Sequence, residues 1–262
     1  MDFSPATLLI LGVVMFVAGV VQSAVGFAGG LIAIPMFVLM GMKLPQAVMI
    51  ALIGSFIQSV MGAYHLRHDI DPRTTIRPAL LRLVTMPVGV YVLWEINQLA
   101  ITQVKQFIGL VLLVIVLVQW WWKVEPRERL HPAWEYLALG ISGFMAGVCG
   151  MGGPAMILWV MAHNWSAKKS RAFMFFVFLA GLIPQGLLLW YEFGDLVIQP
   201  ALIGVLGAFI TVIGSQIGLK IGHGFSKARL RTIVFSLLIF IAVSAMLTPY
   251  THHLYQFFSP NK

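Results

Sequence analysis

The chain contains 262 residues, of which 60% are hydrophobic and 10% are charged. A soluble globular domain averages about 45–50% apolar and about 25% charged residues, so this composition excludes one and indicates a polytopic membrane protein. The 17 Lys and Arg residues outnumber the 9 Asp and Glu residues, but they occur in short loops beside apolar runs. This favours a role in membrane topology over nucleic-acid binding. Because Cys149 is the only cysteine, a disulfide framework and a cysteine-based metal site are excluded.

Apolar segments recur along the whole chain and leave no hydrophilic domain of useful size. Most contain the roughly 20 residues that a helix needs to cross a membrane. The second and seventh have only about 10 to 12 residues, which rise about 15 to 18 Å as helix and cannot span alone. We therefore expect each to form a hairpin with the segment before it. The segments lie near 5–25, 30–41, 45–64, 76–95, 104–122, 134–149, 154–163, 169–190, 199–220 and 229–250.

A glycine cluster interrupts this apolar sequence twice. The first reads Gln22-Ser-Ala-Val-Gly-Phe-Ala-Gly-Gly30, and the second reads Ala146-Gly-Val-Cys-Gly-Met-Gly-Gly-Pro154. The copies are 124 residues apart, which aligns Gly26 with Gly150. Glycine frees the backbone from helical dihedrals, and in hydrocarbon a broken backbone is tolerated only when it is buried in protein or lines a wet cavity. Matched Gly-interrupted segments in two halves point to a transporter's binding site.

The basic residues predict how the chain crosses the membrane. If each hairpin returns to the side from which it enters, 14 of the 17 basic residues lie on one face, which is then the cytoplasmic face. Eight spans in parallel repeats would divide the basic loops between both faces, so we reject that arrangement. In the arrangement with returning hairpins, each half crosses the membrane an odd number of times. This gives an inverted repeat with both termini on the non-cytoplasmic side.

The predicted fold is an all-α polytopic membrane protein with two inverted repeats. Each repeat consists of a broken Gly-rich hairpin and three transmembrane helices. The predicted divisions are a first transmembrane repeat (1–122), a cytoplasmic linker (123–133) and a second transmembrane repeat (134–262). The linker assignment rests on its polar, Pro-punctuated sequence.

The glycine tips are the strongest candidates for a binding site. A helix that starts at such a cluster presents free N–H groups and the positive end of its dipole, which favour an anion. The segments 30–41 and 154–163 both start this way, and we expect their N-termini to meet near the membrane midplane. The alternative is that the glycines only permit close packing, but packing does not explain the two short segments. The candidate backbone ligands are Gly26, Gly29, Gly30, Gly150, Gly152 and Gly153.

Polar side chains near the tips are candidates to complete this site. Arg82 lies several residues inside an apolar segment, where charge is expensive and by default functional; the alternative is that it extends to the nearby interface. The neutral candidates are Gln22 and Ser23 before the first tip, and Ser55 and Gln58 on the next segment. The second half offers Gln185, Ser215 and Gln216. Each neutral residue could equally be a polar contact between helices.

The acidic residues and motifs that are missing argue against other chemistry. The Asp and Glu residues are confined to loops and to the ends of apolar segments. This disfavours a carboxylate proton relay, a carboxylate sodium site and a two-carboxylate hydrolytic centre. The HExxH, Walker and GxSxG motifs are absent. We therefore expect no catalytic residue, no metal and no cofactor.

The duplicated glycine tips, the Ile34-Pro35 pair after the first tip and the division of the spans into two halves resemble the sulfite exporter TauE/SafE family of bacterial membrane transporters. The resemblance covers nearly the whole chain. In that family a third glycine often stands at the places of Ala28 and Pro154. The resemblance implies movement of small sulfur-containing anions, such as sulfite and organosulfonates, across the bacterial cytoplasmic (inner) membrane, and it favours export.

The predicted function is therefore a secondary transporter of a small anion that binds at the glycine tips. Two alternatives are a passive anion channel on the same scaffold and an intramembrane enzyme that acts on a lipid phosphate. The expected partners are the anion and the lipid bilayer, without nucleic acid. Small-residue faces also permit a homodimer.

Overall fold

The computed structural model describes residues 4–25, 28–121, 124–127, 130–224 and 227–258. Within these ranges the chain forms α-helices, two short 3-10 helices and their connections, and the one pairing of β type is a single bridge between Arg127 and His163. This confirms the all-α class. Of the predicted site residues, Gly26 lies outside the described ranges.

The helices fall into two series of five. The first series comprises α1 (Pro5–Val25), α2 (Gly29–Leu39), α3 (Leu44–His65), the 3-10 helix η1 (Arg67–Asp69), α4 (Pro72–Asn97) and α5 (Ile101–Trp121). The second comprises α6 (Pro132–Cys149), α7 (Gly153–Met161), α8 (Ala167–Phe193), the 3-10 helix η2 (Gly194–Val197), α9 (Ile198–Gly224) and α10 (Lys227–Phe258). As predicted, the second helix of each series is short, with 11 residues in α2 and 9 in α7.

Several helix ends follow from local sequence. Proline occupies the first turn of α3, α4, α6 and α7, where its missing N–H costs no helical hydrogen bond. Asp71 caps α4 by accepting a hydrogen bond from the backbone N–H of Arg73 at 3.0 Å. Ser166 caps α8 by accepting one from the backbone N–H of Lys169 at 3.2 Å.

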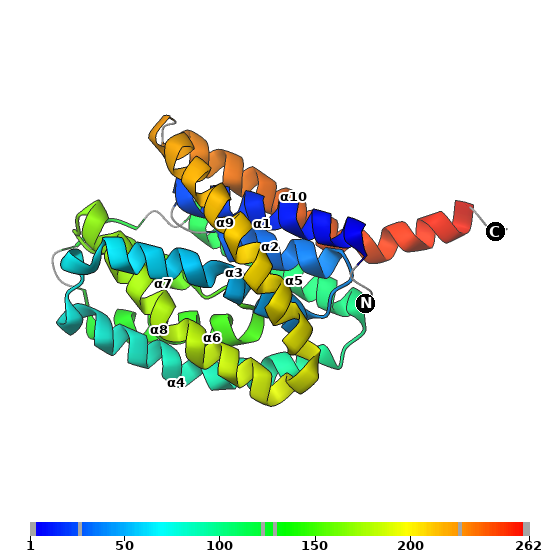
Figure 1. The fold of residues 1–262 in the computed structure, drawn as a ribbon, viewed down its shortest axis with the longest axis horizontal. Helices are drawn as coiled ribbons and strands as arrows, with labels where there is room; N and C mark the ends of the chain where they lie inside the picture. The colour runs from blue at the N-terminus through cyan, green and yellow to red at the C-terminus, as the bar shows by residue number, and fades with distance from the viewer. Residues whose placement is uncertain (1–3, 26–27, 122–123, 128–129, 225–226, 259–262) are drawn as a thin grey trace.

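Five apolar helical stretches of the described chain are long enough to cross a membrane. They are Pro5–Ala24, Leu44–His65, Pro72–Asn97, Ile101–Trp121 and the continuous stretch Lys168–Ile221, which contains α8 and α9. The protein is therefore an all-α polytopic membrane protein, since such runs match the thickness of the hydrocarbon core. In Figure 1 the start of α1 and the end of α10 lie toward the same end of the bundle. On which side of the membrane this end lies stays a prediction.

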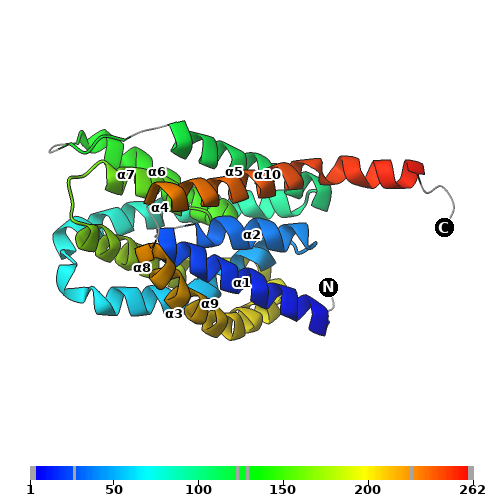
Figure 2. The same cartoon turned by 90° about the horizontal axis from the view of Figure 1, so that it is seen from above.

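The two series make corresponding contacts. α1 packs on α9 and α6 packs on α4, while α3 contacts α8 and α5 contacts α10 (Figures 1 and 2). When each helix is exchanged for its counterpart in the other series, the α1–α9 pair becomes the α6–α4 pair, and the α3–α8 and α5–α10 pairs are unchanged. This pattern is what a repeat leads us to expect. The inverted orientation of the halves and the boundaries of the predicted divisions stay predictions.

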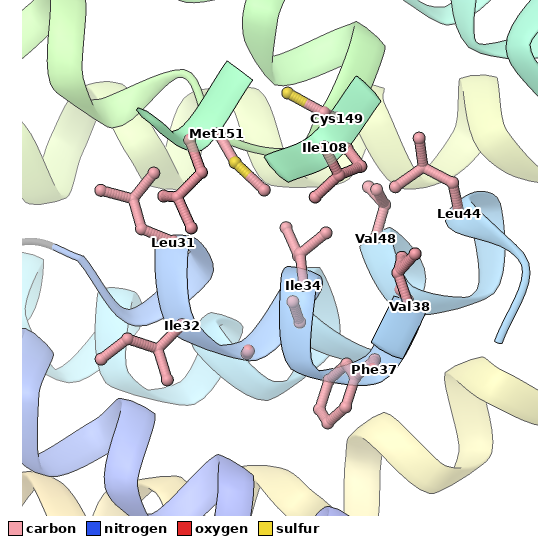
Figure 3. Close-up of a cluster of buried hydrophobic side chains, with 14 of the residues drawn as sticks. Leu31, Ile32, Ile34, Phe37, Val38, Leu44, Val48, Ile108, Cys149 and Met151 are labelled. Carbon is pink, nitrogen blue, oxygen red and sulfur yellow. The ribbon is translucent and has the colours of Figure 1, made fainter. Parts of the chain in front are cut away.

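The short helix α2 lies in the interior of the bundle. Eight of its residues are buried, among them Ile34 and Phe37, whose side chains are at most 1% exposed. Figure 3 shows Ile34 and Val38 facing side chains of α3, α5 and the second glycine cluster, such as Val48, Ile108 and Met151. Because α2 is enclosed by other helices, the described part of this hairpin after the break does not face hydrocarbon.

Candidate functional site

The two glycine tips lie close to each other. Gly150 ends α6 with a φ of 69°, a left-handed conformation that glycine adopts without strain. A methyl group added to Gly30 at the start of α2 would lie 3.5 Å from the carbonyl oxygen of Gly150, and one added to Gly150 would lie 2.6 Å from Cδ1 of Ile34 in α2. Ser142 of α6 donates a hydrogen bond to the carbonyl of Gly152 at 2.6 Å. The second tip is therefore held against its own helix while it packs against α2.

A cavity of about 100 Å³ lies between the tips. Its walls come from both halves: α2, α3 and α4 on one side, and α8 with the connection between α6 and α7 on the other. This volume has room for several water molecules or for one small oxyanion. Its polar or charged lining residues are Gln22, Ser55, Ser59, Arg82 and Gln185.

The cavity brings together most of the residues singled out from the sequence. Nine of them line it: Gln22, Gly29, Gly30, Ser55, Arg82, Gly150, Gly152, Gly153 and Gln185. Ser23 and Gln58 do not contribute to its lining. These placements show which predicted residues are neighbours, and their role as ligands stays a prediction.

Ser23 and Gln58 belong to a separate hydrogen-bonded cluster. The Nε2 atom of Gln58 on α3 donates to the hydroxyl of Ser23 on α1 at 2.9 Å and to the hydroxyl of Ser215 on α9 at 3.0 Å. The hydroxyls of Ser23 and Ser215 also hydrogen-bond each other. Such polar contacts join membrane helices, which is the alternative role that the sequence left open for the two residues. Their role as ligands stays a prediction.

Arg82 is the one charged residue among the described residues that line the cavity. Its side chain is only 5% exposed, so it does not extend to the surface as the interfacial alternative required. Its Nη1 donates to the backbone carbonyl of Val177 at 3.2 Å, and its Cζ lies 5.2 Å from the ring centre of Phe178. Its Nε has no hydrogen-bond partner within the described chain. The ion pair found among the described residues joins Arg77 and Glu135, so no carboxylate there neutralises Arg82.

Neutral polar groups surround the first tip. The side chain of Gln22 lies directly against Gly29, where it would collide with any added Cβ. Ser55 donates its hydroxyl hydrogen to the carbonyl of Ala51 at 2.8 Å, which leaves its oxygen lone pairs able to accept. Gln185 donates to the carbonyl of Ala146 at 2.6 Å and so ties α8 to the end of α6. These contacts fix the walls of the cavity from three helices.

Ser59 and Phe178 are among the lining residues that were not identified from the sequence. Ser59 follows Ser55 by four residues and therefore shares its helical face, a spacing that could have revealed it. Phe178 lies among the many apolar residues of α8, and nothing in the sequence separates it from the others. Its position under Arg82 depends on how α8 docks against α4.

The rest of the cavity wall is apolar, with Ile34, Val48, Leu52, Met151 and Leu182 among its residues. Arg82 and the N-termini of α2 and α7 thus place positive charge or positive potential in an enclosed apolar setting. A low local dielectric strengthens their attraction for an anion. The arrangement can bind a small anion, and no lining residue among those described carries a negative charge that would hold a cation.

Fold and cavity together define a polytopic membrane protein in which two broken hairpins meet at a buried, positively charged cavity. The sequence profile of the Sulfite exporter TauE/SafE family matches residues 11–245, which include both glycine tips and every lining residue. The chain belongs to this family of membrane transporters. Comparisons with curated proteins and with solved structures gave no match.

Proposed function

We propose that the protein is a secondary transporter that exports a small oxyanion, sulfite or a short organosulfonate, and binds it in the cavity between the two glycine tips. The family membership supports the class of substrate and the direction. The single observation that carries the binding site is the buried guanidinium of Arg82, which faces the cavity without a carboxylate partner among the described residues.

A buried charge without a partner is costly. Transfer of an ionised group into an apolar interior carries a penalty of several kcal/mol even after relaxation, and charges within membranes are therefore paired or functional. One carbonyl and one aromatic face offset only part of this penalty for Arg82. An anion in the adjacent cavity supplies the missing countercharge.

The first tip adds hydrogen-bond donors. The N–H of Ile32 makes the first helical bond of α2, to the carbonyl of Ala28 at 3.1 Å. The N–H groups of the three preceding residues have no acceptor within the helix, and all three, Gly29, Gly30 and Leu31, line the cavity. The second tip offers fewer donors because Pro154, in the first turn of α7, has no N–H. The first tip thus contributes more of the contacts to the anion.

Transport requires the cavity to open to either side in turn. The two tips belong to different halves, and a rocking of one half against the other would expose the anion alternately. With an inside-negative membrane potential, each negative charge exported gains about 2.3 kcal/mol per 100 mV. Export of an anion is thus electrically downhill.

Flux into liposomes tests the proposal. Purified protein is reconstituted, and uptake of sulfite, taurine-like sulfonates, sulfate and chloride is compared for the wild type, Arg82→Gln and the matched control Arg77→Gln. We expect saturable uptake of sulfite or a sulfonate by the wild type and by Arg77→Gln, because Arg77 is exposed and pairs with Glu135. The uptake by Arg82→Gln should be lower by at least about tenfold, since the substitution removes a charge-assisted contact to the anion.

Melting curves and size-exclusion profiles establish that Arg82→Gln is folded, and Arg82→Lys, which keeps the charge, should retain part of the flux. Saturable flux that is unchanged in folded Arg82→Gln would refute the site. Flux that does not saturate, and that follows the electrochemical gradient for every anion, would indicate a channel instead.

A further inference from the structure

We infer that Gly181 of α8 is a positioning residue: the space left by its missing side chain seats the Arg82 guanidinium at the cavity and so sets the affinity for the anion. The affinity part of this inference rests on the proposed function. The seat itself is a structural feature that can be tested without any anion.

The seat is formed by one turn of α8. Val177 accepts the hydrogen bond from Nη1 of Arg82 at 3.2 Å, and the ring of Phe178 lies 5.2 Å from Cζ. A Cβ atom on Gly181 would lie 2.8 Å from Nη1 and 3.6 Å from Cζ of Arg82. Glycine at this position therefore leaves the room that the guanidinium occupies.

The helix geometry explains why residue 181 matters. Residues four apart stack on the same face of a helix, so a side chain at 181 stands beside the Val177 carbonyl to which Arg82 donates. An added methyl group would crowd Nη1 and lengthen or break that hydrogen bond. Contacts below 3.0 Å require something to move.

Arg82 has little freedom to move as a whole residue. Its backbone carbonyl lies directly against Gly143 of α6, where any Cβ would collide with it. Thr85, in the next turn of α4, donates its hydroxyl to the carbonyl of Gly140 on α6 at 2.9 Å. With its backbone fixed by α6, the residue can respond to crowding from α8 only by displacing its guanidinium.

We expect Gly181→Ala to weaken anion binding about tenfold, since it disturbs one charge-assisted interaction. The maximal transport rate should change much less, because neither glycine tip is altered. Gly186→Ala is the matched control: it lies on the same helix, and its Cβ would make an ordinary contact of 3.7 Å with Leu52. Its affinity should stay within about twofold of the wild type.

A double-mutant cycle separates positioning from general packing. Gly181→Ala is made in the wild type and in Arg82→Gln, and two quantities are measured in detergent: the melting temperature without anion, and the Kd for sulfite by titration calorimetry. We expect Gly181→Ala to lower both stability and affinity in the wild type. In the Arg82→Gln background it should have little effect on the melting temperature, because the guanidinium that it crowds is gone.

Equal losses of melting temperature in both backgrounds would mean that Gly181 only packs helices, and the inference would fail. If Gly181→Ala lowers the melting temperature only when Arg82 is present, but leaves the Kd of the folded variant unchanged, the affinity role is rejected. A wild type that binds neither sulfite nor a short sulfonate would instead reject the proposed function, while the melting cycle would still decide whether the seat exists.

Discussion

The α4–α6 contact and the α1–α9 contact are built in the same way but carry different chemistry. In the first, Gly143 of α6 lies against the backbone carbonyl of Arg82 on α4. In the second, Gly19 of α1 lies against the backbone carbonyl of Thr211 on α9. Gly19 and Gly143 are 124 residues apart, the same spacing as the glycine tips. Arg82 and Thr211 thus occupy corresponding places in the two halves.

The side chains at these places behave differently. Arg82 reaches a carbonyl on another helix and lines the cavity of about 100 Å³. Thr211 donates its hydroxyl to Gly207 within its own helix at 3.0 Å and lines a cavity of only about 10 Å³. The two cavities share Gln22, Gly29, Gly30, Ala51 and Ser55, so they lie on either side of the first tip. The close packing of a glycine against a backbone carbonyl thus occurs at both contacts, whereas the buried charge and the larger cavity occur beside the α4–α6 contact.

The largest effect is expected when a positive charge is placed at the α1–α9 contact. Thr211→Arg should prevent stable folding or lower the melting temperature strongly, because a buried guanidinium without room or countercharge costs several kcal/mol. Thr211→Val keeps the volume and loses only a hydrogen bond within one helix, so it should cost about 1 kcal/mol. Melting curves of the purified variants measure both. A Thr211→Arg protein that melts like the wild type would show that the two sides are electrostatically equivalent.

The shared packing is tested by filling one glycine in each contact. Gly19→Ala and Gly143→Ala should each destabilise the protein by about 1–3 kcal/mol, since both force an overpacked contact with a backbone oxygen. The control Gly140→Ala has space, because its Cβ would lie 3.8 Å from Thr85.

The affinity for the anion should distinguish the α4–α6 contact from the α1–α9 contact. Gly143→Ala pushes on the backbone of Arg82 and should weaken sulfite binding, whereas Gly19→Ala should leave the Kd within about twofold of the wild type. Titration calorimetry on the folded variants checks this. Equal effects of the two substitutions on Kd would contradict the assignment of the charged site to one side.

The two tips differ in a smaller way. The left-handed residue described at the first tip is Ala28, with a φ of 83°, whereas at the second tip it is Gly150, with a φ of 69°. Gly152, the counterpart of Ala28 in the 124-residue register, has a φ of −74°. A residue with a side chain is strained by about 1–2 kcal/mol in this left-handed region. Replacing it with glycine removes that strain, but the greater conformational freedom of glycine in the unfolded chain cancels part of the gain in stability. Ala28→Gly should therefore raise stability by at most about 1 kcal/mol. A lower melting temperature for this variant would show that the Ala28 methyl makes a contact worth more than the strain.

Gly150→Ala should act in the opposite direction from Ala28→Gly. It adds the same strain, and its Cβ would also lie 2.6 Å from Cδ1 of Ile34. The melting temperature should fall by more than Ala28→Gly raises it. A rise, or no change, would indicate that the tip relaxes to another conformation at little cost.

Much of the site could be anticipated because its signals are local. Two glycine clusters followed by apolar runs too short to span predict broken hairpins, and Arg82 is conspicuous within an apolar segment. Ser23 and Gln58 show the limit of such reasoning. Both are polar, one just before the first tip and the other on α3, yet they bond to Ser215 on α9. The face of the helix that they occupy, and the helix that covers it, depend on contacts between segments almost 200 residues apart.

The sequence by itself determined the membrane class, the two short helices, the glycine tips and the intramembrane charge, because composition, segment length and backbone freedom are properties of neighbouring residues. Only the tertiary structure decided that both tips line one cavity, that Arg82 lies against the turn of α8 from Val177 to Gly181, and that Phe178 and Ser59 line the cavity. These features depend on the docking of helices distant in sequence. Docking is governed by close packing of small residues, whose partners a linear pattern does not specify.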